Sequence, residues 1–137
     1  MKRRGGVGFD ISTIRPSGLR TSNAAKTTDG IGIFMERFSN SCREVAQGGR
    51  RGALMLTISV HHPDIETFVN IKRDLTKVTG ANISIRLTDE FMNAVKNEED
   101  YELRFPTEGE GDKIVSTKTS AKKMWDSIIE SAHTSAE

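Results

Sequence analysis

Two glycine- and arginine-rich stretches stand out because their residue types suit the binding of an anion. The first, KRRGGVGFDIS, begins at Lys2, and the second, QGGRRGALMLTISV, begins at Gln47. Glycine lets backbone N–H groups approach a ligand closely, and the arginine guanidinium presents a rigid fork of hydrogen-bond donors. Both stretches therefore indicate phosphate binding, although neither has the spacing of a GxxxxGK[ST] phosphate loop or a GxGxxG motif. The alternative interpretation is a pair of glycine turns at helix ends with exposed arginines.

The charge distribution places the anion-binding residue types in the first third of the chain. Residues 1–52 hold ten Lys/Arg and four Asp/Glu, a net +6, whereas residues 53–137 hold ten Lys/Arg and fifteen Asp/Glu, a net −5. Ordinary solvated surface charge would give the same numbers, so the charge alone leaves both interpretations open. The 137 residues fit one domain, and the single cysteine, Cys42, excludes an internal disulfide and suits a reducing cytoplasm. No apolar run approaches the ~20 residues of a membrane helix.

The other residue types that could do chemistry do not form a recognisable catalytic or metal site. His61 and His62 are adjacent, and adjacent side chains of a strand point to opposite faces, so we expect a structural role for them. His133 has no visible partner in the sequence, and a Ser–His–Asp arrangement cannot be assembled. Cys42 falls on an apolar helix stripe, which favours a small core residue over a reactive thiol. We therefore predict no catalytic residue and no metal ligand.

Alternating strand and helix patterns must position the two glycine-rich stretches. The sequence predicts strands over 5–12, 53–60 and 101–106, helices over 31–45 and 119–135, a helix that begins near Pro63, and a strand-to-helix passage over 80–95 in which Thr88 is the N-cap. Segment 13–30 is polar and rich in turn residues, so we expect a loop. Strand 53–60 is almost entirely apolar, which predicts burial on both faces. The alternation indicates an α/β fold with largely parallel pairing.

Helix 31–45 lies between the two candidate loops. Its expected buried stripe is Ile31, Phe34, Phe38, Cys42 and Val45, and Thr28 or Asp29 is its expected N-cap. Two donor-rich loops that flank one helix could close over the same nucleotide. A strand that starts at residue 5 and a last helix that is barely complete favour a piece of a larger barrel or sheet.

Three stretches resemble the catalytic chain of ribonucleotide reductase. They are RRGGVGFDISTIRPSG, FMERFSNSCREVAQGGRRGALMLTISVHHPDIETFVNIK and KVTGANISIRLTDEFMNAV. The adenosylcobalamin-dependent class II type is closest, followed by the class I large subunit, and the resemblance covers Arg3 to Glu137. It implies that residues 1–137 are a single segment of the ten-stranded α/β barrel, in which this family reduces ribonucleotides to deoxyribonucleotides with a thiyl radical. Residues 13–30 would be specificity loop one, and residues 46–53 would be specificity loop two.

The resemblance also implies roles for individual residues. The expected effector-binding residues are Lys2, Arg15, Ser17, Gln47, Gly48 and Gly49, and the expected substrate-binding residues are Gly6, Gln47 and Arg51. Arg15 would contact the effector phosphates, and the backbone of Gly6 would line the substrate site. Arg50 occupies a variable position in loop two. Glycine-rich loops suit a segment that must change shape with each effector.

The same resemblance implies partners and a cytoplasmic location without a membrane. The substrate would be a ribonucleotide, the effector a deoxynucleoside triphosphate, the cofactor adenosylcobalamin, the reductant thioredoxin-like, and the assembly a homodimer. The Asn-x-Cys-x-Glu motif that carries the radical cysteine is expected beyond Glu137, and Cys42 is taken to match no family cysteine. The chain would then need the remaining reductase fragments for activity. Two alternatives stay open: a stand-alone nucleotide- or RNA-binding domain, and an inactive remnant.

Overall fold

The computed structural model describes residues 1, 5–22, 25–45, 52–109 and 111–135. The elements in chain order are β1 (Val7–Asp10), α1 (Ile31–Glu44), β2 (Leu54–Ser59), α2 (Ile65–Asn70), the 3-10 helix η1 (Ile71–Arg73), β3 (Asn82–Arg86), α3 (Asp89–Asn97), β4 (Asp100–Phe105), β5 (Val115–Ser120) and α4 (Ala121–Ser135). The predicted alternation of strands and helices is confirmed as far as α3. In these ranges no helix is both long enough and apolar enough to cross a bilayer.

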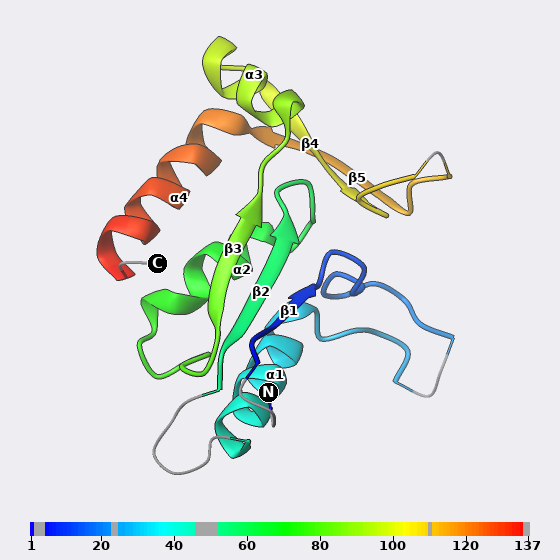
Figure 1. The fold of residues 1–137 in the computed structure, drawn as a ribbon. Coiled ribbons are helices and arrows are strands. Elements are labelled where there is room, and N and C mark those ends of the chain that lie inside the picture. The colour runs from blue at the N-terminus through cyan, green and yellow to red at the C-terminus, as the bar shows by residue number, and fades with distance from the viewer. Residues whose placement is uncertain (2–4, 23–24, 46–51, 110, 136–137) are drawn as a thin grey trace.

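The first three strands form a parallel sheet in the order β1-β2-β3, as the alternation predicted. Both α1 and α2 lie behind this sheet in Figure 1, so they cover the same face. Leu54, Leu56 and Ile58 point towards this covered face and are at most 4% exposed. The prediction that the strand is buried on both faces is wrong, because Met55, which alternates with them, is 40% exposed. No described element covers the second face of the sheet (Figure 1).

The second part of the fold is an antiparallel hairpin of β4 and β5, packed with α3 and α4. The strand β5 has the sequence VSTKTS, which is polar and half exposed, so no hydrophobic alternation predicted it. The N-cap of α3 is confirmed, because the Thr88 hydroxyl accepts from the Phe91 N–H at 3.2 Å. Phe91 is fully buried, and its ring lies edge-on to Tyr101 with centroids 4.7 Å apart.

Two hydrogen bonds attach this hairpin to the end of β2. The backbone N–H of Arg104 donates to the His61 carbonyl at 2.7 Å. The Tyr101 hydroxyl donates to the Val60 carbonyl at 3.2 Å, and Tyr101 is only 2% exposed. The carboxyl end of β2 is therefore a junction between the parallel sheet and the hairpin (Figure 1).

The buried side of α1 differs from the predicted stripe. Ile31 and Cys42 are buried as expected, but Met35 and Ser39 complete the stripe in place of Phe34 and Phe38. The reason is a close backbone approach, since the Gly80 N–H donates to the Ser39 hydroxyl at 2.8 Å. A Cβ on Gly80 would lie 2.5 Å from the Ser39 carbonyl oxygen. Only a small polar residue fits this position of α1.

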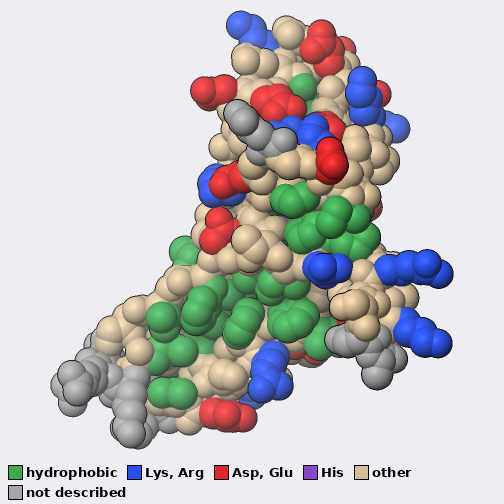
Figure 2. All heavy atoms as spheres, turned by 90° about the vertical axis from the view of Figure 1, so that its right-hand side faces the viewer, with side chains coloured by type: hydrophobic (Ala, Val, Ile, Leu, Met, Phe, Trp, Pro, Cys, Tyr) green, Lys and Arg blue, Asp and Glu red, His purple; other side chains and the backbone are tan. Residues whose placement is uncertain are grey.

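The displaced aromatic residues of α1 lie towards the β1 edge of the sheet. Phe38 stacks on Phe9 with ring centroids 5.2 Å apart, and Phe9 is 42% exposed. Phe34 is 41% exposed and Ile33 is 56% exposed. Figure 2 shows hydrophobic side chains gathered on the side of the molecule that carries β1.

Candidate functional site

The described residues of segment 13–30 form a loop, as the sequence predicted, and backbone hydrogen bonds fold it into an arm. The Gly18 N–H donates to the Thr28 carbonyl at 2.9 Å, and the Thr28 N–H donates to the Leu19 carbonyl at 3.1 Å. Further out, the Thr21 N–H donates to the Lys26 carbonyl at 2.9 Å, around an antiparallel bridge between Arg20 and Thr27. The turn residues seen in the sequence therefore build an irregular hairpin between β1 and α1, which extends from the molecule in Figure 1.

Arg15 and Ser17 lie at the base of this arm, and both are exposed. The Arg15 guanidinium donates through Nη1 to the Arg20 carbonyl at 2.9 Å. A guanidinium has five N–H donors, so one bond to the arm orients the group and leaves donors for an anion. The Ser17 backbone N–H donates to both carboxylate oxygens of Asp64, at 2.9 and 3.1 Å. The base of the arm is thus a fixed platform for an exposed cation.

The predicted N-cap of α1 is wrong, and the residue that replaces it connects the arm to α2. Gly30 occupies the cap position and has no side chain to offer, so neither Thr28 nor Asp29 caps the helix. Instead, Asp64 accepts from the Ile31 N–H at 3.2 Å. One carboxylate, placed before the first residue of α2, therefore binds both ends of the arm.

Both adjacent histidines are structural, as predicted, although they lie in the turn after β2 and not in the strand. His62 is fully buried, its Nδ1 accepts from the Asp64 N–H at 3.0 Å, and its Nε2 lies 2.8 Å from the Ile14 carbonyl. His61 is 1% exposed, with Nδ1 2.7 Å from the Glu102 carbonyl and Nε2 2.8 Å from the Thr88 hydroxyl. Burial lowers the pKa of both imidazoles below the ordinary histidine value, so both are neutral near pH 7.

Glu102 of β4 and Glu90 of α3 both form ion pairs at the hairpin. Glu102 accepts from the Lys113 ammonium at 2.5 Å and from the Ser116 hydroxyl at 2.7 Å, and these bonds hold the pKa of Glu102 at about 2. The Arg104 guanidinium donates to both oxygens of Glu90 at 3.0 Å. Such paired carboxylates stay ionised and stabilise the β4–β5 hairpin.

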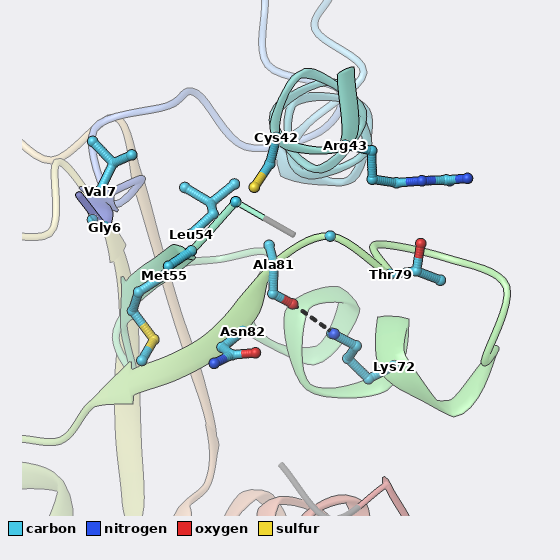
Figure 3. Close-up of a pocket in the computed structure, with 14 residues that line it drawn as sticks. Gly6, Val7, Cys42, Arg43, Leu54, Met55, Lys72, Thr79, Ala81 and Asn82 are labelled. Atoms are coloured by element: carbon cyan, nitrogen blue, oxygen red, sulfur yellow. Dashed lines mark hydrogen bonds between the residues drawn. The ribbon is translucent and has the colours of Figure 1, made fainter. Parts of the chain in front are cut away.

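Gly6 borders a hollow of about 1110 Å³ at the amino ends of the three parallel strands. Figure 3 shows the hollow between β1, the end of α1 and the start of β3. A Cβ on Gly6 would lie 3.5 Å from the Ala53 side chain, an ordinary contact distance, so a small side chain would fit there. The Lys72 ammonium donates to the Ala81 carbonyl at 2.6 Å. Gly6 therefore lines a hollow, and its role in substrate binding stays a prediction.

The remaining predicted site residues, Lys2, Gln47, Gly48, Gly49, Arg50 and Arg51, lie outside the described residues. Their described neighbours still locate the two ends of α1. Gly30 precedes this 14-residue helix and Val45 follows it, so about 21 Å of helix separates them. Gly52 then packs on Cys42, because a Cβ there would lie 2.8 Å from the Cys42 Sγ. The described residues next to the two loops therefore lie at opposite ends of α1.

The letters Asn-x-Cys-x-Glu do occur in the chain, at Asn40–Glu44, and the sequence interpretation overlooked them. The structure places them within α1. Cys42 is 1% exposed, and its Sγ lies towards the core near Leu54 in Figure 3, whereas Glu44 is exposed. Residues two positions apart on a helix do not face each other. This thiol and this carboxylate therefore cannot act together on one substrate.

The described residues do not fit the binding of a cobalamin or a metal ion. Among them, no three His, Cys, Asp or Glu side chains come close enough to share a metal ion. The ring nitrogens of His61 and His62 are occupied by the hydrogen bonds above. His133 stands exposed in the last turn of α4. No described residue is therefore assigned to such a cofactor.

Comparison with known proteins identifies relatives of this chain. Residues 1–137 match the family described as ribonucleotide reductase, barrel domain. The chain is 34% identical to the vitamin B12-dependent ribonucleoside-diphosphate reductase of Mycobacterium tuberculosis (strain CDC 1551 / Oshkosh), over 94% of this chain and 18% of that protein. It is 33% identical to the reductase of the same name from Thermoplasma acidophilum, over 99% of this chain and 17% of that protein.

A viral relative is also named as a ribonucleoside-diphosphate reductase, but its name does not mention vitamin B12. The chain is 31% identical to the ribonucleoside-diphosphate reductase large subunit of Monkeypox virus, over 80% of this chain and 15% of that protein. The chain therefore spans less than a fifth of the length of these relatives. The family match over its whole length nevertheless shows that this chain belongs to the ribonucleotide reductase family.

Proposed function

We propose that this chain is the segment of a ribonucleotide reductase large chain that carries the allosteric specificity elements. The complete enzyme reduces ribonucleotides to deoxyribonucleotides by thiyl-radical chemistry. The observation that carries the assignment is Arg15, an exposed guanidinium oriented at the base of a hydrogen-bonded arm directly after β1. The family match supplies the reaction class, and the arm supplies a place for an anionic effector.

The proposed effector is a deoxynucleoside triphosphate, bound by Arg15 and Ser17 of the arm together with Lys2, Gln47, Gly48 and Gly49. The proposed substrate residues are Gly6, Gln47 and Arg51. The positions of Arg15, Ser17 and Gly6, which the structure describes, support these proposed binding roles. Arg15 is exposed beside Ser17, and Gly6 opens onto the hollow at the amino ends of the strands.

The three parallel strands are proposed as part of the ten-stranded barrel of the complete enzyme. Within the described chain, β1 and β3 each pair on one side only, so each has an edge that can accept a further strand. The uncovered face carries Thr57, Ser84 and Arg86 beside Met55, and Arg86 pairs with Asp10 at 3.3 Å. A polar, partly charged sheet face suits the inside of a barrel that binds a nucleotide.

A homodimer is proposed because the two specificity loops attach to opposite ends of α1. Two copies that pack α1 against α1 in antiparallel orientation would bring the arm of one subunit beside loop two of the other. Ile33 and Phe34 are exposed on α1 and give it apolar side chains for such packing. The effector would then bind between the arm of one subunit and loop two of the other. A single chain would not need to bring both of its own loops to one nucleotide.

The catalytic groups are proposed to come from the rest of the enzyme. Two relatives are named as vitamin B12-dependent, so we propose adenosylcobalamin as the radical source of the complete enzyme, held by residues other than those described. We also propose a thioredoxin-like reductant and a cytoplasmic location. The radical cysteine belongs to the remaining fragments, since Cys42 is buried and turned away from Glu44.

The effector assignment is tested with Arg15→Ala in the reductase assembled from this chain and the remaining large-chain segments. The dissociation constant for deoxynucleoside triphosphates, measured by equilibrium dialysis, is expected to rise roughly 10- to 100-fold, because a charge-assisted hydrogen bond contributes about 1.5–3 kcal/mol. The matched control is Arg73→Ala, which removes only an exposed ion pair with Glu130. Equal affinity of Arg15→Ala and the parent enzyme would reject the proposed site.

The role of Cys42 is tested by Cys42→Ala in the same assembled enzyme. Turnover is expected to stay within about threefold of the parent, while the free energy of unfolding falls by about 1 kcal/mol through the lost buried sulfur. Glu44→Gln is expected to change neither quantity appreciably. A loss of turnover beyond about a thousandfold in a folded Cys42→Ala enzyme would instead make Asn40–Glu44 the radical motif.

A further inference from the structure

The turn His62–Pro63–Asp64 contacts the arm and the first residue of α1 at three backbone positions. The Asp64 carboxylate accepts from the Ser17 N–H at 2.9 and 3.1 Å and from the Ile31 N–H at 3.2 Å. The His62 imidazole lies 2.8 Å from the Ile14 carbonyl. These positions lie at the start of the arm and directly after its end, although they are 33 to 48 residues away from the turn in sequence.

The protonation state of His62 follows from its partners. The Asp64 N–H can only donate, so Nδ1 of His62 is the acceptor in that bond. The ring proton is then on Nε2, which donates to the Ile14 carbonyl. Full burial and the edge of the Phe105 ring, 5.9 Å away between centroids, fix the imidazole in place. The turn therefore presents one rigid donor and one carboxylate acceptor to the arm.

These contacts bracket the proposed effector arginine. Arg15 lies between Ile14, whose carbonyl is bound by His62, and Ser17, whose N–H is bound by Asp64. The backbone of residues 14–17 is therefore held on both sides of the residue whose side chain is exposed. Since the same carboxylate binds the first N–H of α1, the start of the arm keeps a fixed position relative to this helix.

We propose that His62 and Asp64 are positioning residues that hold Arg15 where it binds the effector phosphates. The inference rests on the proposed function, since it needs Arg15 to contact the effector. His62 and Asp64 act through the backbone of the arm and touch no ligand. They also connect effector binding to the end of β2, because the turn directly follows this strand.

The test measures deoxynucleoside triphosphate affinity in the assembled reductase with Asp64→Ala, Asp64→Asn, His62→Ala and His62→Gln. Asp64→Ala and His62→Ala are expected to raise the dissociation constant at least about fivefold. His62→Gln keeps an N–H donor and is expected to recover most of the affinity, which a merely space-filling role would not require. Glu66→Ala, an exposed carboxylate of α2, is the matched control and is expected to bind like the parent. If Asp64→Ala does not fold, Asp64→Asn, which keeps one acceptor oxygen, takes its place.

The double variant Asp64→Ala/Arg15→Ala separates this inference from the proposed function. If Asp64 acts through Arg15, the double variant binds no more weakly than Arg15→Ala alone, whereas independent contributions would multiply. Unchanged affinity in Arg15→Ala would overturn the proposed function. Weakened binding in Arg15→Ala with unchanged binding in Asp64→Ala and His62→Ala, or multiplying effects in the double variant, would overturn the positioning role alone.

Discussion

Replacing Phe91 with alanine is expected to lower the free energy of unfolding by about 3–5 kcal/mol. Phe91 is fully buried and lies edge-on to Tyr101, with ring centroids 4.7 Å apart, and it is 6.4 Å from the ring of Trp125. It therefore joins α3 to β4 and to α4. Its removal leaves a cavity that these aromatic neighbours cannot fill without leaving their own positions, so the cost lies in the upper range for buried side chains.

Chemical denaturation of the chain measures this loss, and Phe34→Ala is the matched control. Phe34 is 41% exposed on α1, so the same truncation there is expected to cost about 1 kcal/mol or less. A stable folded domain has about 5–15 kcal/mol in total, so Phe91→Ala removes a large share. A loss below about 1.5 kcal/mol for Phe91→Ala would mean that α3 is not docked on β4 as described.

Local signals in the sequence were sufficient for most elements. Thr88 is a favourable N-cap residue directly before a helical pattern, and this local signal predicted the N-cap that the structure shows. The apolar run of β2 predicted its strand, and the periodicity predicted α1. The β5 strand gave no such signal, because a half-exposed strand of Ser, Thr and Lys is stabilised by its pairing with β4 and not by its own burial.

Long-range contacts decided the features that the sequence could not predict. The stripe of α1 shifts from Phe38 to Ser39 because Gly80, 41 residues later, approaches the helix backbone. The same holds for the candidate site. Arg15 was expected from the resemblance, but nothing near it in sequence indicated that Asp64 would bind both ends of the arm. The pattern Asn-x-Cys-x-Glu at Asn40–Glu44 is the opposite case. It matches the sequence motif, but its position within a helix keeps the two side chains apart.

Gly30→Ala adds one methyl group, and we expect it to disrupt the arm more strongly than a methyl group added at any other position near the arm. Gly30 has φ 76° and ψ −167°, a backbone conformation that is essentially restricted to glycine, and a side chain there costs about 1–3 kcal/mol in strain. The added Cβ would also lie 2.5 Å from the Asp64 Oδ2 and 2.8 Å from the Ser17 Cβ. The Asp64 carboxylate would have to move away from Ser17 and Ile31, so we expect a total loss of about 2–5 kcal/mol.

Gly32→Ala gives the same chemical change with the opposite expected sign. Gly32 lies in the first turn of α1, and a Cβ there would meet only the Thr67 side chain at 3.9 Å. Alanine is the better helix former by about 0.5–1 kcal/mol, so this variant should be slightly more stable than the parent. Thermal unfolding compares the two variants, and effector affinity in the assembled reductase should fall at least about tenfold for Gly30→Ala only. Equal stability of both variants would show that the arm does not depend on the contact between Gly30 and Asp64, because strain and collision act at residue 30 and not two residues later.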